Sequence, residues 1–304
     1  MLETRAALGG PRKAGGSMSR GLDHVIHAVQ DLDAAGEFYS RLGFTVGARN
    51  RHPWGTHNRV VQFPNFFLEI LTVGEPEKLP ASDSANRFAT MNHDFLTDIG
   101  EGLSGLVLES NNPAADLAIF EAAGFGGVPL FHFSRKGKRA DGSDTEVGFD
   151  LVFTNYAVSP RALFFTMKQS QPQNFWSPEL QLHANGAVAI SACALVAENP
   201  TDHHIFLECL AGVRNVHSSS LGLAIRTPRG VVLALDRRGF ADTYGVEPPL
   251  DEGLRVGAIV FKVRDFGATR ALFEQNGVPA REHRDKLVVS GQAAHGAVLA
   301  FEAS

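Results

Sequence analysis

Two ionisable side chains near the start of the chain, His24 and Glu69, stand in short segments rich in apolar residues. His24 lies in LDHVIHAV and Glu69 lies in NFFLEIL, and apolar runs of this kind predict strands. Because side chains alternate along a strand, His24 and Glu69 converge if the faces that carry them coincide. An ionised carboxylate is costly to bury without a partner. The pair therefore indicates either a site for Zn, Ni, Mn, Mg or Fe, or a buried His24–Glu69 hydrogen bond without metal.

A second group of polar residues lies between these segments, in RHPWGTHNR at 51–59. At the rim of a pocket, such a loop would supply an aromatic wall, hydrogen bonds and a cation for an anionic substrate. The residues expected to bind substrate are Trp54, Thr56, His57, Asn58 and Arg59. The alternative is a hairpin loop with its turn at Gly55. His57 would also reach a metal at His24 and Glu69 if the loop folds inward.

The pattern leaves the roles of four further residues open. His183 and Asn185 lie in HANG, which is typical of a turn as well as of a site, and His295 and Glu302 flank the last apolar segment. The charged run RKGKRADGSD at 135–144 predicts a solvated hairpin between two strands.

The elements that must position these residues are repeated along the chain. Asp31, Asn112 and Asp265 are each followed by a glycine twelve positions later. Asp and Asn are good N-caps and glycine suits the left-handed residue that ends a helix, so each segment predicts a helix. A weaker fourth copy runs from Asn199 to Gly212. Each copy follows one apolar segment and precedes further strand-like segments. This order indicates a βαβββ unit repeated four times and an α+β fold.

Length and composition limit the classes of function that the chain can have. The 304 residues, 44% of them hydrophobic, predict two globular domains at 18–170 and 183–304 with a linker at 171–182. Residues 1–17 lack the apolar core of a secretory signal, so we expect a disordered tail or a start at Met18. A net charge of −5 gives no nucleic-acid footprint, and no apolar run is long enough to span a bilayer. The two cysteines form no disulfide-rich pattern, which favours a cytoplasmic protein.

The four units, opening with LDHVIHAVQDLDAAGEFYSRLGF, resemble the vicinal oxygen chelate superfamily, which includes glyoxalase I, bleomycin-resistance proteins and extradiol dioxygenases. WGTHNR at 54–59, FFLEIL at 66–71 and HANGA at 183–187 resemble its glyoxalase-like branch. The resemblance implies the glyoxalase/bleomycin resistance fold, with paired units forming two cup-shaped mixed sheets and the helices outside.

The resemblance also implies a divalent metal in the cup, held by a His from a first strand and a Glu from a last strand, with a matching pair from the partner unit. His24 and Glu69 match those positions. The other three units depart from the pattern. Their first-strand positions fall near Ser104 or Gly105, Ser191 and Ala258, and their last strands carry Thr166, Asp236 and Glu302.

Three functions follow as expectations. The first is a metal-dependent lyase or isomerase in which the metal binds vicinal oxygens of a small substrate, with His24 as ligand and Glu69 as ligand and catalytic base. The second is a metal-free protein that sequesters a hydrophobic or aromatic small molecule, which the 22 phenylalanines favour. The third is an extradiol-type dioxygenase, which requires His57, His132 or another histidine to join the pair. In each case the partner is a small molecule, not nucleic acid or membrane, and the protein is a monomer or homodimer.

Overall fold

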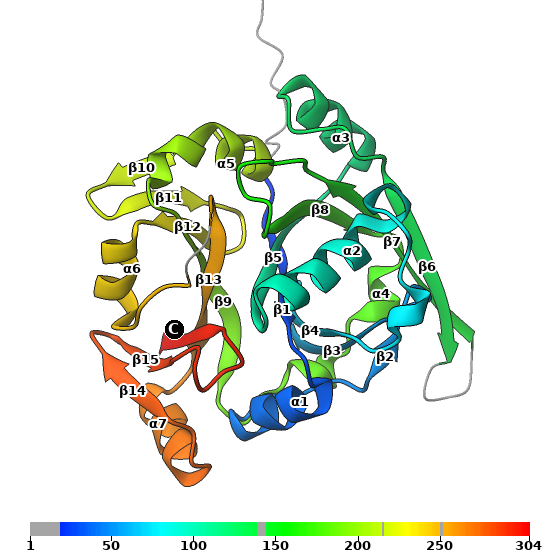
Figure 1. The fold of residues 1–304 in the computed structure, drawn as a ribbon. Coiled ribbons are helices and arrows are strands. Elements are labelled where there is room, and N and C mark those ends of the chain that lie inside the picture. Colours follow the sequence, from blue (N-terminus) through cyan, green and yellow to red (C-terminus); the bar gives the residue numbers. More distant parts are fainter. Residues whose placement is uncertain (1–18, 139–143, 215, 250–251) are drawn as a thin grey trace, which may run out of the picture.

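The computed structural model describes residues 19–138, 144–214, 216–249 and 252–304. The tail expected at 1–17 and the tip of the hairpin expected at 135–144 lie outside these ranges. The described residues form two mixed eight-stranded sheets that stand side by side, each curved around its own concave face (Figure 1). We call the two curved sheets the first cup and the second cup.

The first cup contains eight strands: β1 (Leu22–Ala28), β2 (Asn50–Arg51), β3 (Thr56–Phe63), β4 (Phe66–Val73), β5 (Gly102–Glu109), β6 (Phe131–Lys138), β7 (Asp144–Phe153) and β8 (Leu163–Gln169). Their order across the sheet is β2-β3-β4-β1-β5-β8-β7-β6. β1 pairs in parallel with β4 and antiparallel with β5, so two units meet at their first strands.

The second cup repeats this plan with another eight strands: β9 (Ala187–Val196), β10 (Val216–Ser219), β11 (Gly222–Arg226), β12 (Val231–Leu235), β13 (Arg255–Val263), β14 (Ala280–His283), β15 (Lys286–Val289) and β16 (Val298–Ala303). Their order is β10-β11-β12-β9-β13-β16-β15-β14, and β9 pairs antiparallel with β13. The predicted four βαβββ units, paired into two sheets, are confirmed.

The chain also forms these helices: α1 (Leu32–Arg41), α2 (Asp83–Asp98), α3 (Pro113–Ala122), α4 (Pro172–Phe175), α5 (His204–Ala211), α6 (Arg237–Tyr244) and α7 (Phe266–Gln275), with 3-10 helices η1 (Pro76–Lys78), η2 (Pro178–Gln181) and η3 (Pro200–His203). The predicted caps are present on α1, α3 and α7. Asp31, Asn112 and Asp265 each accept hydrogen bonds from backbone N–H groups of the first turn, and the glycines that end these segments take positive φ. In the weaker copy, Asn199 precedes η3 without a side-chain cap, and Gly212 ends α5 at a φ of 65°.

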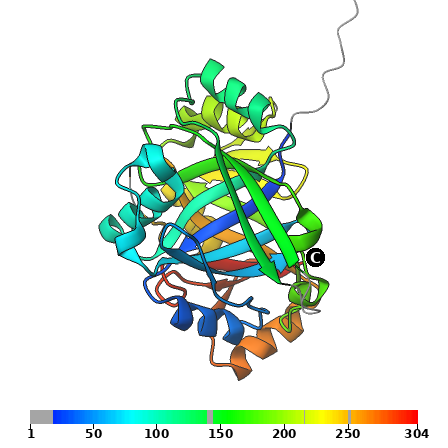
Figure 2. The same ribbon diagram turned by 90° about the vertical axis from the view of Figure 1, so that its right-hand side faces the viewer.

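The main hydrophobic core lies between the two cups. It joins the outer faces of both sheets with α1, α3, α5 and α7, and Tyr39, Phe120, Phe206 and Phe273 from these helices are almost completely buried. In both views α1 and α7 lie at one end of this core and α3 and α5 at the other (Figures 1 and 2). The cups therefore stand back to back, and their concave faces point away from each other.

Two helices that the repeat pattern does not predict lie on the concave faces. α2 packs inside the first cup, where Phe88 joins the hydrophobic cluster on that face, and its backbone is kinked at Asn86. α6 packs inside the second cup through Phe240 and Tyr244. In the segment 171–182, Phe175 packs against Phe67 of the first cup with 5.0 Å between ring centroids. These additions narrow both cups.

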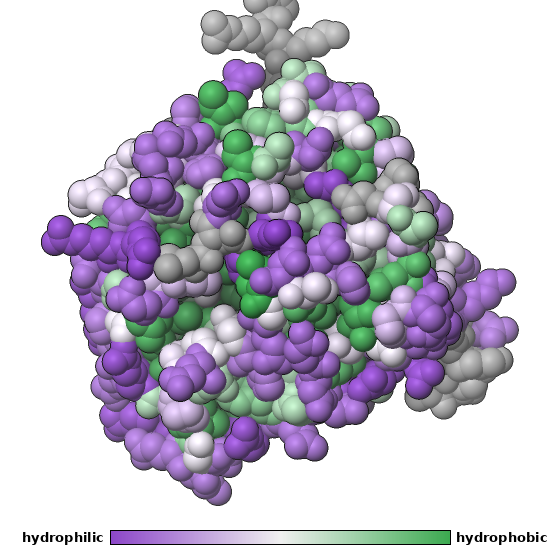
Figure 3. Space-filling model, viewed as in Figure 1, coloured by the Kyte–Doolittle hydropathy of each residue, from purple (hydrophilic) through white to green (hydrophobic). Residues whose placement is uncertain are grey.

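The outer surface is mixed in polarity. Hydrophobic residues are scattered among hydrophilic ones over the face shown in Figure 3. No helix within the described ranges has the length and apolar character that crossing a membrane requires.

Candidate functional site

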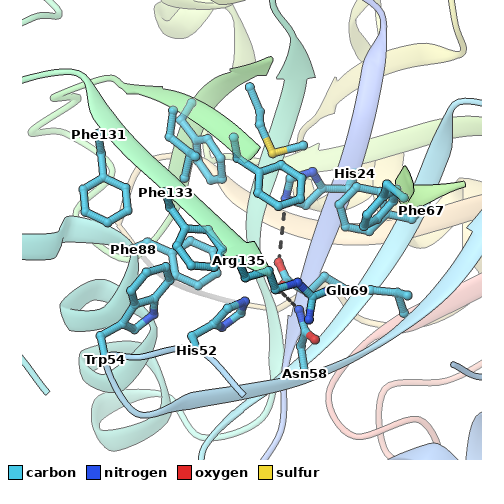
Figure 4. Close-up of a pocket in the computed structure, with 16 residues that line it drawn as sticks. His24, His52, Trp54, Asn58, Phe67, Glu69, Phe88, Phe131, Phe133 and Arg135 are labelled. Carbon is cyan, nitrogen blue, oxygen red and sulfur yellow. Dashed lines mark hydrogen bonds and ion pairs between the residues drawn. The ribbon is translucent and has the colours of Figure 1, made fainter. Parts of the chain in front are cut away.

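The concave face of the first cup holds a pocket with about 570 Å³ of space, counted to its open mouth. Strand alternation directs His24, Asn58, Phe67 and Glu69 into it, since β1, β3 and β4 are neighbours in the sheet. The pocket has two different ends (Figure 4). His24, Asn58, Glu69 and Arg135 gather at one end, whereas rings from Trp54, Phe88, Phe131 and Phe133 form the other.

The polar end is organised around His24. Its Nδ1 lies 2.7 Å from Oδ1 of Asp23, and its Nε2 lies 3.7 Å from Oε2 of Glu69. Phe67 stacks on the imidazole with 4.3 Å between ring centroids. Asp23, His24 and Glu69 are all buried. With Nδ1–H donated to Asp23, the ring is fixed in orientation and Nε2 faces the pocket.

Glu69 is the buried carboxylate that the sequence singles out. Asn58 Nδ2 donates to its Oε1 at 2.5 Å, and the Arg135 guanidinium lies beside it (Figure 4). Burial raises the pKa of Glu69, and His24, the Asn58 hydrogen bond and the charge of Arg135 only partly oppose this. Arg135 Nη1 also donates to Oδ1 of Asn50 at 2.6 Å. The polar end therefore contains a carboxyl group with an elevated proton affinity and a guanidinium fixed nearby.

The hydroxyl group of Thr56 positions two of the rings at the aromatic end. Trp54 Nε1 donates to Oγ1 of Thr56 at 2.8 Å, and Nδ1 of His52 lies 2.8 Å from the same oxygen. The His52 ring stacks on Trp54, and packing among Trp54, Phe88 and Phe133 lowers the pKa of His52 far below its ordinary value. At neutral pH His52 is therefore an uncharged ring, and this end of the pocket is apolar.

The structure brings only some of the predicted substrate-binding residues to the pocket. Trp54 and Asn58 line it, and Thr56 lies behind Trp54. His57 and Arg59 point to the opposite face of β3, where His57 Nε2 lies 3.0 Å from Glu75 and Arg59 donates to Asp33 at 2.8 Å. The segment was expected to be a loop, but β3 begins at Thr56, so alternation separates these neighbours.

Sequence reasoning missed several residues of this site. Asp23 could have been identified from the sequence, since it directly precedes His24. Arg135 lies in the run that was interpreted as a solvated hairpin, yet it belongs to β6 and reaches the polar end. Phe88 comes from α2, which the repeat pattern does not include.

The donor atoms in the first cup do not fit the predicted metal centre. Among the residues that the structure describes, no group of three or more His, Cys, Asp or Glu side chains could hold an ion. Zinc sites use three or four protein ligands, whereas His24 and Glu69 supply two. The second unit contributes Phe165 and Met167 to this pocket, and Arg135 already places a positive charge beside Glu69.

The other residues considered as metal ligands lie elsewhere. Thr166 Oγ1 donates to Asp116 at 3.0 Å, and Ser104 Oγ donates to Asn92 at 2.6 Å. His132 is exposed and lies 2.7 Å from its cross-strand neighbour Asp150. The two-His, one-carboxylate set of an extradiol-type dioxygenase is thus not assembled within the described ranges.

The sequence left the roles of four residues open: His183, Asn185, His295 and Glu302. In the structure the first three hold neighbouring segments together, and Glu302 belongs to the second cup. His183 accepts from Thr45 N at 3.1 Å and lies 2.9 Å from the carbonyl oxygen of Gln62, so it joins the linker segment to the first cup. Asn185 donates to the carbonyl of Leu42 at 2.8 Å. His295 lies 3.0 Å from Glu101, and Glu302 lines a pocket of the second cup.

Comparison with solved structures gives the same fold at low sequence identity. A hypothetical protein from Staphylococcus aureus aligns with a TM-score of 0.67 and 13% identity, covering 94% of this chain and all of that chain. A triple mutant of 4-hydroxymandelate synthase from Streptomyces coelicolor aligns at 0.55 and 12%, covering 93% and 92%. A xylose isomerase-like TIM barrel/4-hydroxyphenylpyruvate dioxygenase fusion protein aligns at 0.54 and 14%, covering 95% of this chain and 49% of that chain.

Sequence comparison supplies the family. No curated protein matches the chain. A family model described as a glyoxalase-like domain matches residues 22–211, which include all of the first cup and the first strand and helix of the second. The chain therefore belongs to the glyoxalase-like domain family, within the vicinal oxygen chelate superfamily.

Proposed function

We propose that this protein is a lyase or isomerase that moves a proton on a small aromatic carbonyl compound bound in the first cup. The observation that carries the proposal is the buried row Asp23–His24–Glu69 at the polar end of an aromatic pocket. Burying ionisable groups in such a row is costly for a site that only binds. A carboxyl group such as Glu69, whose pKa burial raises beside specific neighbours, is typical of catalytic sites.

His24 is the base in this proposal. Its Nδ1–H bond to Asp23 leaves the Nε2 lone pair directed into the pocket. Asp23 also stabilises the imidazolium that forms when Nε2 takes a proton from the carbon beside the substrate carbonyl. Asp23 acts through His24 and is therefore a positioning residue.

Glu69 is the matching acid. Its raised pKa increases the protonated fraction near neutral pH, so it can donate a proton to the carbonyl oxygen. A carbon and the oxygen of the adjoining carbonyl are roughly 2.4 Å apart. His24 Nε2 and Glu69 Oε2 are 3.7 Å apart, which lets the two groups contact those two atoms together. The carbon loses one proton to His24 while the oxygen gains one from Glu69, and the product is an enol.

The fate of the enol decides the reaction class. Where the carbonyl is conjugated to a further double bond, the His24 proton can return to the distal carbon of the dienol while the oxygen proton goes back to Glu69, which gives an isomer. Where the carbon next to the deprotonated one carries a leaving group, that group departs with the His24 proton, the oxygen proton goes back to Glu69, and an unsaturated carbonyl compound is the elimination product. Neither route draws on an oxidant or on a metal ion.

The rest of the pocket indicates the kind of substrate. Trp54, Phe88, Phe131 and Phe133 offer ring faces and edges to an aromatic group. Arg135, at the other end, suits a carboxylate attached to the carbonyl. Two of the similar folds carry names of proteins that act on or form hydroxyphenyl acids, which supports an aryl 2-oxo acid as the first probe.

The test uses phenylpyruvate in heavy water, with proton NMR following exchange at its benzylic carbon. We expect the protein to accelerate exchange over the spontaneous rate, and His24→Gln to lower the enzymatic rate by about 100-fold or more. Asp23→Asn should lower the rate and shift its pH profile, because the imidazole loses its fixed tautomer. His132→Gln is the matched control, since His132 is exposed and lies outside the pocket.

Treatment with a chelator completes the test. Exchange should persist after chelation, and activity that requires added metal would overturn the acid–base mechanism. Phenylpyruvate that binds without any accelerated exchange would refute the enzyme assignment.

A second function has specific support from the lining of the pocket. Aromatic and aliphatic side chains make up most of that lining, which favours sequestration of an aromatic molecule without chemistry. Trp54 in the wall and Trp176 nearby would report such binding by fluorescence. Binding that His24→Gln leaves intact, together with no proton exchange, would identify a sequestering protein.

A further inference from the structure

The second cup holds its own pocket, which no part of the proposed chemistry uses. About 760 Å³ of space lies on its concave face between the strands and α6. The apolar part of the lining consists of small and branched side chains from the strands: Ala192, Ala224, Val231, Leu233 and Val260. In contrast with the first cup, Tyr244 is the one Phe, Tyr or Trp residue among the described lining residues.

Tyr244 at the base of this pocket has an unmet hydrogen-bonding requirement. Its side chain is 0% exposed, and its hydroxyl has no hydrogen-bond partner among the described residues. A buried polar group left unpaired is costly, and native proteins keep few of them. Burial also raises the pKa of Tyr244, so the hydroxyl keeps its proton and can donate it. A ligand acceptor would satisfy this group.

Arg226 is the group in the lining of this pocket that favours an anion. Glu302 accepts from Ser191 and pairs with Lys286 at 2.9 Å, and Lys286 also pairs with Asp285 at 2.8 Å. Lys286 is shared between two carboxylates, so these three groups together carry one negative charge. Arg226 is exposed and forms no ion pair within the described part of the chain.

His217 adds a second nitrogen-bearing group at the same rim. It pairs with Ala224 across the β10–β11 ladder, and Arg226 is two residues further along β11, so all three side chains share one face. Both His217 and Arg226 line the pocket. A guanidinium without an ion pair, carried by a strand on the same face as an imidazole, suits a carboxylate or a phosphate.

We propose that the second cup binds a small organic anion, with its carboxylate or phosphate at Arg226 and its apolar body against the strand side chains. The Tyr244 hydroxyl donates to a polar atom at the inner end of that ligand. This site is separate from the proposed catalytic pocket, because the two concave faces point away from each other.

The test uses the full chain labelled with 3-fluorotyrosine and observed by fluorine NMR. The chain contains three tyrosines, and Tyr244→Phe identifies the resonance of Tyr244. Tyr39 and Tyr156 serve as internal references, since they lie outside the second pocket. Benzoate and phenyl phosphate are the two probes, and neutral benzamide is the control for apolar contact alone.

We expect a saturable shift of the Tyr244 resonance with at least one anion and none with benzamide. Whichever anion binds more tightly identifies the carboxylate or the phosphate as the preferred group. Arg226→Gln should weaken binding by about tenfold or more, because it removes a charge-assisted contact. Arg226 is exposed, so this variant keeps the fold. Arg135→Gln, which alters the first pocket, should leave the Tyr244 titration unchanged.

Three results would overturn the proposal. The first is a Tyr244 resonance that stays fixed with both anions. The second is a shift with benzamide as large as the shift with an anion. The third is a shift in Arg226→Gln as large as that in the wild type. Tryptophan fluorescence reports binding in the first cup, because Trp54 and Trp176 both lie there. A fluorescence change without a Tyr244 shift would place all anion binding in the first cup and refute the second site.

Discussion

Acidification should destabilise this protein through one buried histidine, His27. Its side chain is 0% exposed on the face of β1 that points away from the first pocket. Its Nδ1 lies 2.7 Å from the Tyr39 hydroxyl and its Nε2 lies 2.8 Å from the carbonyl oxygen of His295. The neutral ring satisfies both contacts, because Tyr39 donates to Nδ1 and Nε2–H donates to the carbonyl. Burial lowers the pKa of His27 from 6.5 to about 4.

The sign follows from proton binding. Between pH 6.5 and 4 the unfolded chain binds a proton at this position and the folded chain does not, so the free energy of unfolding falls as the pH falls. Because the pKa of His27 falls from 6.5 to about 4 on folding, complete protonation of this ring would lower the free energy of unfolding by about 3 kcal/mol. About 2 kcal/mol of this is lost on going from pH 8 to pH 5. Glu101 and His295 face the same region, and the charge of Glu101 reduces the effect while that of His295 increases it.

The assay is urea unfolding of the wild type and His27→Gln, measured at pH 8, 6 and 5. His27→Gln should be less stable at pH 8, since it loses the contact with Tyr39, but its free energy of unfolding should fall less steeply with acid. His93→Gln is the control, because His93 is a surface histidine whose side chain is 42% exposed. Parallel pH profiles for the wild type and His27→Gln would refute the assignment of acid sensitivity to His27.

Other substitutions test further features of the structure. Because the pKa of Glu69 is raised in the folded state, the free energy of unfolding should fall as the pH rises through and above 4.5. Glu69→Gln should remove that fall in urea titrations, and a pH profile of this variant that matches the wild type would count against the prediction. Gly55→Ala should lower stability by about 2 kcal/mol or more in thermal unfolding, since Gly55 has a φ of +94° and an added Cβ would lie 2.2 Å from the Glu75 carbonyl oxygen; an unchanged midpoint would contradict this. Arg20→Met should cost about 3 kcal/mol in urea unfolding, because it leaves Asp116 buried without the guanidinium that lies 2.5 Å away; a loss below about 1 kcal/mol would show that the pair matters little.

Local sequence signals predicted the repeated units well. The helix that begins after Asp31 and ends before Gly43 depends on a side-chain cap and a left-handed glycine, and both lie within that segment. The same chemistry defines the helices after Asn112 and Asp265. Four copies of one local pattern were enough to indicate a repeated α+β unit, and the family resemblance implied that these units pair into two sheets.

The convergence of His24 and Glu69 could also be anticipated, since both lie on apolar strands of one unit and strand alternation has a period of two. Alternation along β3 also explains why His57 and Arg59 point away from the pocket. A loop interpretation of 51–59 let all of its side chains face the pocket, whereas the early start of β3 at Thr56 sends alternate residues to opposite faces. A shift in one strand boundary was enough to divide the predicted group.

The family resemblance implied the pairing of the units into two sheets. The sequence by itself determined the four units and the presence of a histidine and a glutamate on two strands of the first unit. These depend on caps, turns and alternation, which act over a few residues. The tertiary structure decided what surrounds that pair. Arg135 reaches Glu69 from β6 of the second unit, and the same unit lines the pocket with Phe165 and Met167. Such contacts join residues far apart in the chain, so no local pattern encodes them, and the acid–base chemistry that we propose depends on them.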